Sequence, residues 1–296
     1  MREEYFMTDD LKAQAIALYD RFTHEGLERR EFMTRMVAIA GSVAAAEALI
    51  GGIAAAPAAA AIVPADDQRL TIRTQTIAGT NSYVAEPRSR SLKPTIIVIH
   101  ENRGLNDHIR DVARRAAIAG YRAVAPDFLT PLGGTPADEN RARDLIGKLD
   151  LGQASAAGVA MLNALAGSSR GGKVGAVGFC WGGAYVNRLA VDAGPALDAG
   201  VVYYGTAPDP SQAPRVSAPL LVQLAGLDAR VNATGFPWVE ALRAAGKPVT
   251  FQLYDGVNHA FHNDTSAERY DEAAATLSWQ RTLRFFKRHL AQGPAK

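Results

Sequence analysis

Only one cysteine, Cys180, is present among the 296 residues of this sequence. A lone cysteine excludes an intramolecular disulfide and cannot by itself build a zinc or iron–sulfur site. Strong charge is also lacking, because 32 Lys and Arg residues against 30 Asp and Glu residues give a formal net charge of +2. Such a balance offers little attraction to a nucleic acid or an anionic membrane. We therefore expect no nucleic-acid partner, and any role of Cys180 is that of a thiol.

A long run of leucine and isoleucine is missing as well. Residues 37–63 carry a single charged side chain, Glu47, and are numerous enough to cross a bilayer, but most of them are Ala or Gly. This weak hydrophobicity predicts no permanent membrane anchor.

The segment 29–65 resembles a twin-arginine signal peptide. It combines the pair Arg29-Arg30 with Phe32, a mildly apolar stretch and small residues through 58–60. Such signals export folded proteins, so this interpretation predicts a periplasmic or secreted protein. The alternative is an Ala-rich helix packed on the surface of a cytoplasmic protein, with Glu47 on its solvent side. The long stretch before the arginines weakens the export interpretation, and whether residues 1–65 are cleaved stays open.

The chain divides into three parts. Residues 1–28 predict a short accessory helix, because Leu11, Ala15, Leu18 and Phe22 share one helical face. Residues 29–65 are the segment just described. Residues 66–296 alternate strand-like and helix-like patterns, which predicts one α/β domain with a mostly parallel central sheet and helices on both faces. A hydrophobic fraction of 48% is enough for a sizeable core.

The apolar patterns place the expected elements of this domain. Strands are expected at 71–77 and 82–85, as a hairpin, and at 95–99, 122–126, 173–178, 199–204, 219–224 and 249–254. Helices are expected at 107–119, 141–149, 154–166, 184–191 and near 238–245, followed by a closing helix with an apolar stripe. Residues 130–136 predict an ordered surface loop.

The most informative string is Gly178-Phe179-Cys180-Trp181-Gly182, which begins at the last residue of the expected strand 173–178. A nucleophile on a sharp strand-to-helix turn needs glycine two residues before and two residues after it, since side chains there would collide with neighbouring backbone. The following helix directs its N-terminal dipole at the sulfur, which favours the reactive thiolate. A buried structural cysteine is the alternative, but the strand–turn–helix context favours a nucleophile.

A thiol nucleophile usually needs a base and an orienting acid. Asp228 and His259 follow Cys180 in that order, and each comes just after a predicted strand. The carboxyl ends of parallel strands meet at one edge of the sheet, where active sites form. The other acidic candidates, Asp209 and Asp255, are expected in turns. His262 lies three residues from His259, but two histidines alone are a poor metal signature. Surface positions are expected for His24, His108 and His289.

The loop 100–105 follows the expected strand 95–99. A loop at this position can supply one oxyanion donor, the backbone N–H of Asn102, while the residue after the nucleophile, Trp181, supplies the other.

Together these motifs resemble the dienelactone hydrolase family, which are α/β-hydrolases with a cysteine nucleophile. The resemblance covers residues 94–290 and includes the strings at 100–105, 125–127, 178–183, 203–205, 226–228 and 256–261. It implies the α/β-hydrolase fold, with Cys180, Asp228 and His259 as a catalytic triad. It also implies that Glu101 contacts the resting thiol and can accept its proton; a carboxylate beside sulfur disfavours thiolate. Alternatively, Glu101 caps the helix that is expected to start near residue 107.

One position departs from the family pattern. Family members that open dienelactones hold the substrate carboxylate with arginines, one of them four residues after the triad histidine, where this chain has Asn263. Arg141 or Arg143 falls near the second arginine, and Arg103 is a further cation expected near the site. The substrate is therefore open among esters, lactones and thioesters.

The expected activity is hydrolysis of a carboxylic ester or lactone through an acyl-thioester on Cys180. Two alternatives remain: an inactive hydrolase scaffold whose thiol senses redox state or a ligand, and an acyltransferase. No residue requires a metal or an organic cofactor, and the oligomeric state is open.

Overall fold

A computed structural model of the protein describes residues 9–54, 61–88, 93–167 and 172–291. Within these residues the centre is an eight-stranded sheet of order β1-β2-β4-β3-β5-β6-β7-β8. The strands β1 and β2 form an antiparallel hairpin, β2 pairs antiparallel with β4, and all pairs from β4 to β8 are parallel. The mostly parallel sheet and the hairpin confirm the predicted fold class.

The strands lie close to the expected ranges. Their bounds are β1 Leu70–Ile77, β2 Thr80–Pro87, β3 Thr95–Ile99, β4 Arg122–Pro126, β5 Val174–Phe179, β6 Ala199–Tyr203, β7 Leu220–Ala225 and β8 Val249–Tyr254. The inner strands β3, β5, β6 and β7 are buried along their whole length. Burial on both faces explains why each reads as a continuous apolar run in the sequence.

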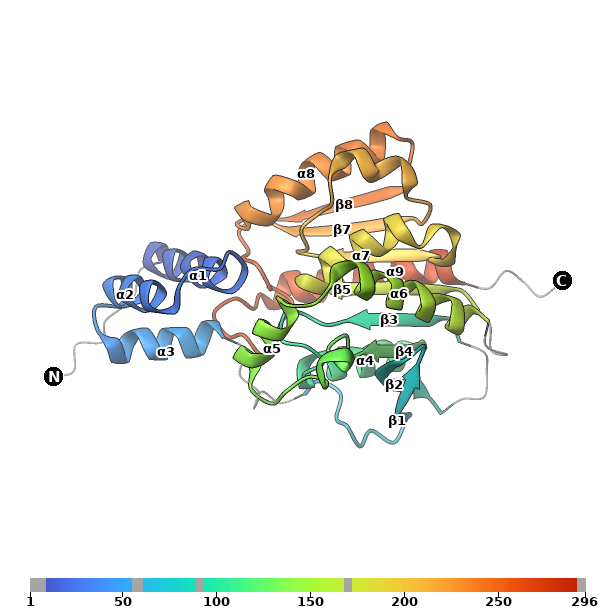
Figure 1. Ribbon diagram of the computed structural model, residues 1–296, viewed down its shortest axis with the longest axis horizontal. Coiled ribbons are helices and arrows are strands. Elements are labelled where there is room, and N and C mark those ends of the chain that lie inside the picture. Colours follow the sequence, from blue (N-terminus) through green and yellow to red (C-terminus); the bar gives the residue numbers. More distant parts are fainter. Residues whose placement is uncertain (1–8, 55–60, 89–92, 168–171, 292–296) are drawn as a thin grey trace.

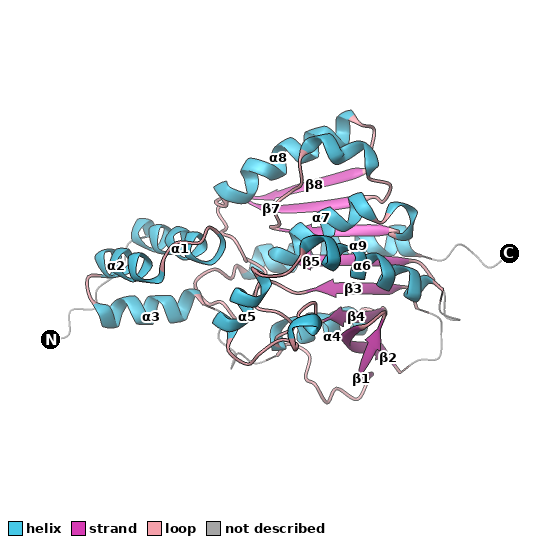
Figure 2. Ribbon diagram, in the orientation of Figure 1, coloured by secondary structure: helices cyan, strands magenta, loops and turns pink. Residues whose placement is uncertain are grey.

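Helices cover both faces of the sheet (Figure 2). One face carries α4 (Asp107–Ile118) and α9 (Glu272–Leu290), and the other carries α6 (Leu151–Ala166), α7 (Trp181–Asp192) and α8 (Ala229–Ala244). Shorter helical segments are α5 (Glu139–Ile146), η1 (Thr130–Leu132), η2 (Gly194–Ala196) and η3 (Pro210–Arg215). The helix α8 begins well before the expected position near residue 238.

Three further helices form a separate small core. They are α1 (Asp9–His24), α2 (Arg29–Ala40) and α3 (Val43–Ile53), and their inward side chains include Tyr19 and Phe32. We call residues 9–54 the N-terminal cap. The predicted boundary between residues 28 and 29 does not separate two packed units, because α1 shares one core with α2 and α3. The small residues 58–60 lie outside the described residues.

The N-terminal cap sits at the end of the sheet to which the parallel strands point (Figure 1). It is fastened to the loop before α9: the Ser266 hydroxyl donates to the Ile53 carbonyl (2.6 Å), and the Glu268 amide donates to the Gly52 carbonyl (3.1 Å). Lys12 pairs with Glu268 at 2.6 Å. The cap therefore covers the carboxyl edge of the sheet, where an α/β site is expected.

No single helix in the described ranges is both long and apolar enough to cross a membrane. The helices α2 and α3 meet that standard only as a pair, and they are bent by 103° relative to each other.

Candidate active site

The residue Cys180 occupies a strained turn between β5 and α7. Its φ of +54° and ψ of −112° are rarely adopted by a residue with a side chain, and Cys180 as a whole is 6% exposed. The Cys180 amide donates to the Tyr203 carbonyl of the adjacent strand at 3.1 Å, which fixes the turn. The sharp strand-to-helix turn expected from the sequence is therefore present.

The flanking glycines are required by close backbone contacts. A Cβ on Gly178 would lie 1.9 Å from the Gly182 carbonyl oxygen, and a Cβ on Gly182 would lie 2.4 Å from the Ile99 carbonyl oxygen. Both distances are far inside van der Waals contact, so the turn that presents Cys180 can form only with glycine at these two positions.

The side chains of Asp228 and His259 come together at the same edge. Asp228 follows β7 and caps α8 by accepting from the Val231 amide, and its Oδ2 lies 2.5 Å from His259 Nδ1. Burial alone would lower the pKa of His259, but the charges of Asp228 and Cys180 outweigh it and raise that pKa. Burial would likewise raise the pKa of Asp228, yet the charge and hydrogen bond of His259 lower it. The pair thus favours imidazolium beside carboxylate.

A cavity of about 350 Å³ opens at Cys180. Asn102 and Trp181, whose backbone N–H groups are the expected oxyanion donors, both line it. Trp181 begins α7, so its amide lies at the positive end of that helix. The structure therefore brings the sulfur and both expected donor residues to one cavity.

The carboxylate of Glu101 is buried beside this cavity. Its Oε2 accepts from the Asn263 side-chain amide at 2.7 Å, and its Oε1 accepts from the Tyr204 hydroxyl at 3.4 Å. Burial, followed by the charges of Glu101 and Cys180, raises the pKa of Tyr204 well above its ordinary value. Asn263, at the position where the resemblance led us to expect an arginine, holds this glutamate in place.

The structure gives Arg103 a different environment from the one expected. Its guanidinium donates to the Tyr19 hydroxyl (2.7 Å), the Glu139 carbonyl (3.1 Å) and the Asn140 side chain (3.3 Å). Arg103 is not among the described residues that line the cavity at Cys180. Its contacts join the N-terminal cap to α5.

Two other arginines do line the cavity, Arg143 and Arg230. Arg143 is anchored on the Asp144 carboxylate and lies over the Phe22 ring, 4.6 Å from its centroid, while its Nη1 is buried with no hydrogen-bond partner among the described residues. The Nε atom of Arg230 is likewise buried and has no hydrogen-bond partner among the described residues. Buried donors without a partner are costly, so these two nitrogens are ready to bind an acceptor group of a ligand.

Comparison with known proteins identifies this architecture. Residues 80–290 match the model of the dienelactone hydrolase family. The chain belongs to this family. A relative from Escherichia coli O157:H7, named "Putative carboxymethylenebutenolidase", is 33% identical over 257 residues, covering 80% of this chain and 94% of its own length. A relative of the same name from Saccharolobus solfataricus is 31% identical, covering 70% of this chain and 93% of its own.

A solved structure agrees. The "Putative Dienelactone Hydrolase" of Klebsiella pneumoniae superposes with a TM-score of 0.66 at 29% identity, covering 73% of this chain and 98% of its own. The protein is therefore a hydrolase of the dienelactone hydrolase family.

The matched family region begins at residue 80, so the N-terminal cap lies outside it. The cap nevertheless contributes a residue to the cavity: His24, the last residue of α1, places Nε2 3.8 Å from Cys180 Sγ, and its ring lies 5.1 Å from that of His259. The expectation that His24 lies on the surface is wrong. Burial, followed by the charges of His259 and nearby arginines, lowers the pKa of His24 well below its ordinary value, which keeps the ring neutral.

A second residue near the site that the sequence did not single out is Arg269, whose side chain is 9% exposed. Its Nη1 lies 3.4 Å from Asp20 Oδ1, its Nε donates to the Ser266 hydroxyl, and the guanidinium lies 5.4 Å from the centroid of the Tyr19 ring. Burial would lower the pKa of Arg269, but the charges of Asp20, Tyr19, Glu101 and Cys180 raise it. This arginine therefore couples the cap to the cavity electrostatically.

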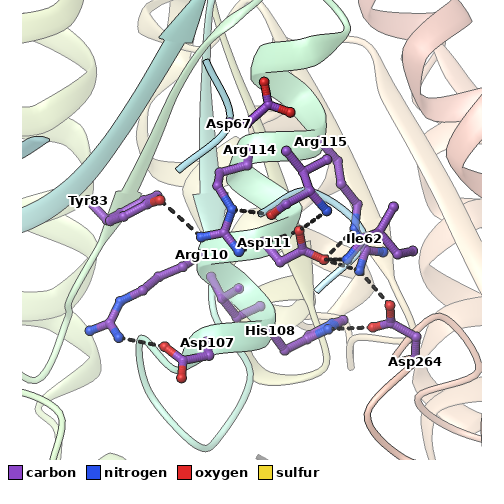
Figure 3. A network of polar contacts seen from close by, with 12 residues as sticks. Ile62, Asp67, Tyr83, Asp107, His108, Arg110, Asp111, Arg114, Arg115 and Asp264 are labelled. Carbon is purple, nitrogen blue, oxygen red and sulfur yellow. Dashed lines mark hydrogen bonds and ion pairs between the residues drawn. The ribbon is translucent and has the colours of Figure 1, made fainter. Parts of the chain in front are cut away.

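The loop that carries His259 is held by a network on α4 (Figure 3). Asp264 Oδ1 lies 2.9 Å from His108 Nδ1, and Asp264 Oδ2 accepts from Arg115 at 2.6 Å. Asp111 accepts from the backbone amides of Ile62 and Val63. Burial would raise the pKa of Asp264, but its two partners lower it to about 2.

Three other histidines, His108, His262 and His289, are not among the described residues that line the cavity at Cys180. His108 is buried against Asp264 and is not at the surface as expected. His262 packs among Phe179, Tyr203 and Trp279, so it is a core residue. His289 lies against Phe285 on α9, outside the site.

Proposed function

We propose that the protein hydrolyses a carboxylic ester or lactone with Cys180 as nucleophile, His259 as general base and acid, and Asp228 as the group that orients His259. The observation that carries this proposal is the strained turn at Cys180, which lines a cavity and holds Sγ within 4.8 Å of a ring nitrogen of His259, itself paired with Asp228 at 2.5 Å. Nucleophile, base and orienting carboxylate are the three parts that covalent acyl transfer requires.

In the first step the thiolate of Cys180 attacks the carbonyl carbon. The carbonyl oxygen gains the negative charge and is stabilised by the backbone N–H groups of Trp181 and Asn102, a contribution worth about 3–4 kcal/mol per donor. When the tetrahedral intermediate collapses, the C–O bond breaks and the imidazolium of His259 gives its proton to the departing alkoxide. The product of this step is an acyl-thioester on Cys180.

In the second step neutral His259 takes a proton from water as the water oxygen attacks the thioester carbonyl. Collapse of this second intermediate breaks the C–S bond, releases the acid and restores thiolate beside imidazolium. The raised pKa of His259 suits this cycle, because it stabilises the proton on the ring in the resting state.

Glu101 has a supporting role in this proposal. The Asn263 amide and the Tyr204 hydroxyl hold its carboxylate beside the cavity. When substrate enters an enzyme molecule whose Cys180 thiol is still protonated, either His259 or Glu101 can receive the thiol proton.

The cavity favours substrates that carry a carboxylate besides the scissile ester. Arg143 and Arg230 each present a buried guanidinium nitrogen with no hydrogen-bond partner among the described residues, and both line the cavity at Cys180. Arginine binds carboxylates in a geometrically specific way. These two residues take the place of the arginine that Asn263 does not supply.

The experiment is a panel of lactones and short esters, with and without a free carboxylate, assayed with the full chain and with Cys180→Ala. Many turnovers per thiol, abolished in the variant, are expected. Full turnover by Cys180→Ala would overturn the proposal. A thiol modified only once would indicate the sensing alternative, and ester products formed with added alcohol would indicate an acyltransferase.

We also retain export through the twin-arginine segment as a proposal. Arg29 and Arg30 begin α2 within the N-terminal cap, so cleavage after residue 53 would remove His24 from the cavity. The N-terminal sequence and mass of the protein from separated cell fractions test this. An intact chain found only in the cytosol would contradict export.

A further inference from the structure

Three potential metal ligands meet at the junction between the N-terminal cap and the catalytic domain. His24, Cys180 and His259 each offer one ligand atom, and these atoms all lie within 4.8 Å of one another. The three residues come from the end of α1, the turn after β5 and the loop after β8. The proposed reaction uses only two of them, so the position of His24 needs another explanation.

The spacing suits a tetrahedral metal ion. Zinc binds thiolate at about 2.3 Å and imidazole at about 2.0–2.1 Å, which places sulfur and nitrogen roughly 3.6 Å apart at a tetrahedral angle. The observed separation between Cys180 Sγ and His24 Nε2 is 3.8 Å. The other two separations are no larger than 4.8 Å, so the side chains would move inward to complete the coordination.

A second observation comes from His259. Its Nδ1 is held by Asp228 at 2.5 Å, while Nε2 is buried and has no hydrogen-bond partner among the described residues. Metal-binding histidines usually have this arrangement, with one ring nitrogen fixed by a carboxylate and the other free for the metal. The His259 ring is therefore already oriented as a ligand.

We propose that His24, Cys180 and His259 form a binding site for a thiophilic divalent cation such as Zn²⁺, which blocks the nucleophile and fastens the N-terminal cap over the cavity. A fourth coordination position stays open toward the cavity. Removal of the cation frees the sulfur. The cation site stands on geometry alone, and only its inhibitory effect rests on the proposed function.

Charged groups of the surrounding elements also bear on binding. The anionic groups near the site are Asp20 from α1, Asp228 at the start of α8 and Glu101 after β3, and the cationic ones are Arg103, Arg143, Arg230 and Arg269. Four cationic groups against three anionic ones give the surroundings no net attraction for a cation, so the thiolate supplies it.

The test is a titration of the full chain, freed of metal by a chelator, with Co²⁺ at pH 7.5. A thiolate-to-cobalt charge-transfer band that saturates at one ion per chain is expected, with Zn²⁺ competing for the same site. Cys180→Ser should lose the band. His24→Ala should weaken affinity by at least about 100-fold, since even the loss of a supporting hydrogen bond costs 10–100-fold. The Asp228→Asn variant should lose about 10- to 100-fold in affinity for the ion. The His289→Ala variant, changed outside the site, should bind the ion as tightly as the parent.

Two results would overturn the proposal: absence of the band in the parent chain, or equal affinity of the parent and His24→Ala. His24→Gln, checked by circular dichroism, guards against a folding defect in the alanine variant and should weaken binding to a similar extent. The titration uses no substrate, so a failure of the proposed hydrolysis leaves its outcome intact. In an active enzyme, inhibition by Zn²⁺ should be reversed by chelator and shifted by His24→Ala to the same extent as binding.

Discussion

The Nε2 atom of His24 lies 3.8 Å from Sγ of Cys180, although 156 positions separate the two residues in the chain. The ring of a residue from the N-terminal cap thus lies beside the sulfur that the proposed hydrolysis uses as its nucleophile. Besides offering a ligand atom, it limits the space available to an acyl group.

We expect His24→Ala to widen the range of accepted acyl groups. Removing the imidazole opens space beside Cys180, and a difference of one or two methylenes is worth about tenfold or more in a pocket that fits closely. The ratio of kcat/KM for a butyrate ester over an acetate ester, measured without metal, should therefore rise by about that factor. The same ratio in His289→Ala is the control; an unchanged ratio in His24→Ala would contradict a steric role.

Docking of the N-terminal cap should weaken at acidic pH. The folded pKa of His24 is lowered, first by burial and then by the charges of His259, Arg230, Arg269 and Arg103. The undocked ring has an ordinary pKa near 6.5, so it binds more protons than the docked ring below that pH. The contribution of His24 to docking is complete above about pH 6.5 and is lost as the pH falls below it.

Hydrogen exchange of the α1 amides between pH 7.5 and 5.0, corrected for intrinsic rates, measures this loss. The difference between the parent and His24→Gln isolates His24 from Asp20, whose burial raises its pKa and acts with the opposite sign. Equal pH dependence in both proteins would count against the assignment.

Arg143→Ala and Arg230→Ala should each impair substrates with a free carboxylate and spare neutral ones. A hydrogen bond to a charged group contributes about 1.5–3 kcal/mol, which corresponds to roughly 10- to 150-fold in kcat/KM. The comparison uses a pair of esters that differ only in a terminal carboxylate or its methyl ester. If both esters lose activity equally, the arginines stabilise the fold and do not select the substrate.

Gly178→Ala should destabilise the protein by at least about 3 kcal/mol, because overpacking against backbone cannot be relieved by side-chain motion. The new Cβ would lie 1.9 Å from the Gly182 carbonyl oxygen. Gly51→Ala in α3 is the matched control: nothing lies within 4 Å of its Cβ position, and a gain of about 0.5–1 kcal/mol is expected. Urea unfolding of the three proteins measures both, and a Gly178 variant as stable as the parent would refute the turn geometry.

The strands of the sheet could be predicted from the sequence because their burial is expressed locally. The ranges of β3, β4 and β8 were predicted to the residue, since β3 and β4 are short apolar runs and β8 alternates apolar and polar residues, each next to turn signals. The start of α8 could not be predicted in this way. Asp228 caps the helix and Pro237 lies inside it, and aspartate and proline are both typical of loops in a sequence.

The cap's role at the cavity could not be predicted, for a different reason. The apolar face of α1 was visible in Leu11, Ala15, Leu18 and Phe22, but a helical face does not say what it contacts. His24 and His108 carried no local signal either, because His24 approaches Cys180 and His108 pairs with Asp264 only through the folded chain. Asp228 and His259 could be found because each follows a strand at the edge where parallel strands end.

The most direct test of the central claim is to trap the acyl-enzyme. The full chain is mixed with a p-nitrophenyl ester, quenched with acid within milliseconds and digested, and the peptides are weighed. We predict one acyl group per chain on the peptide that contains Cys180, removed by neutral hydroxylamine as a thioester is. Steady turnover with the acyl group on another residue, or with none bound to Cys180, would contradict the account.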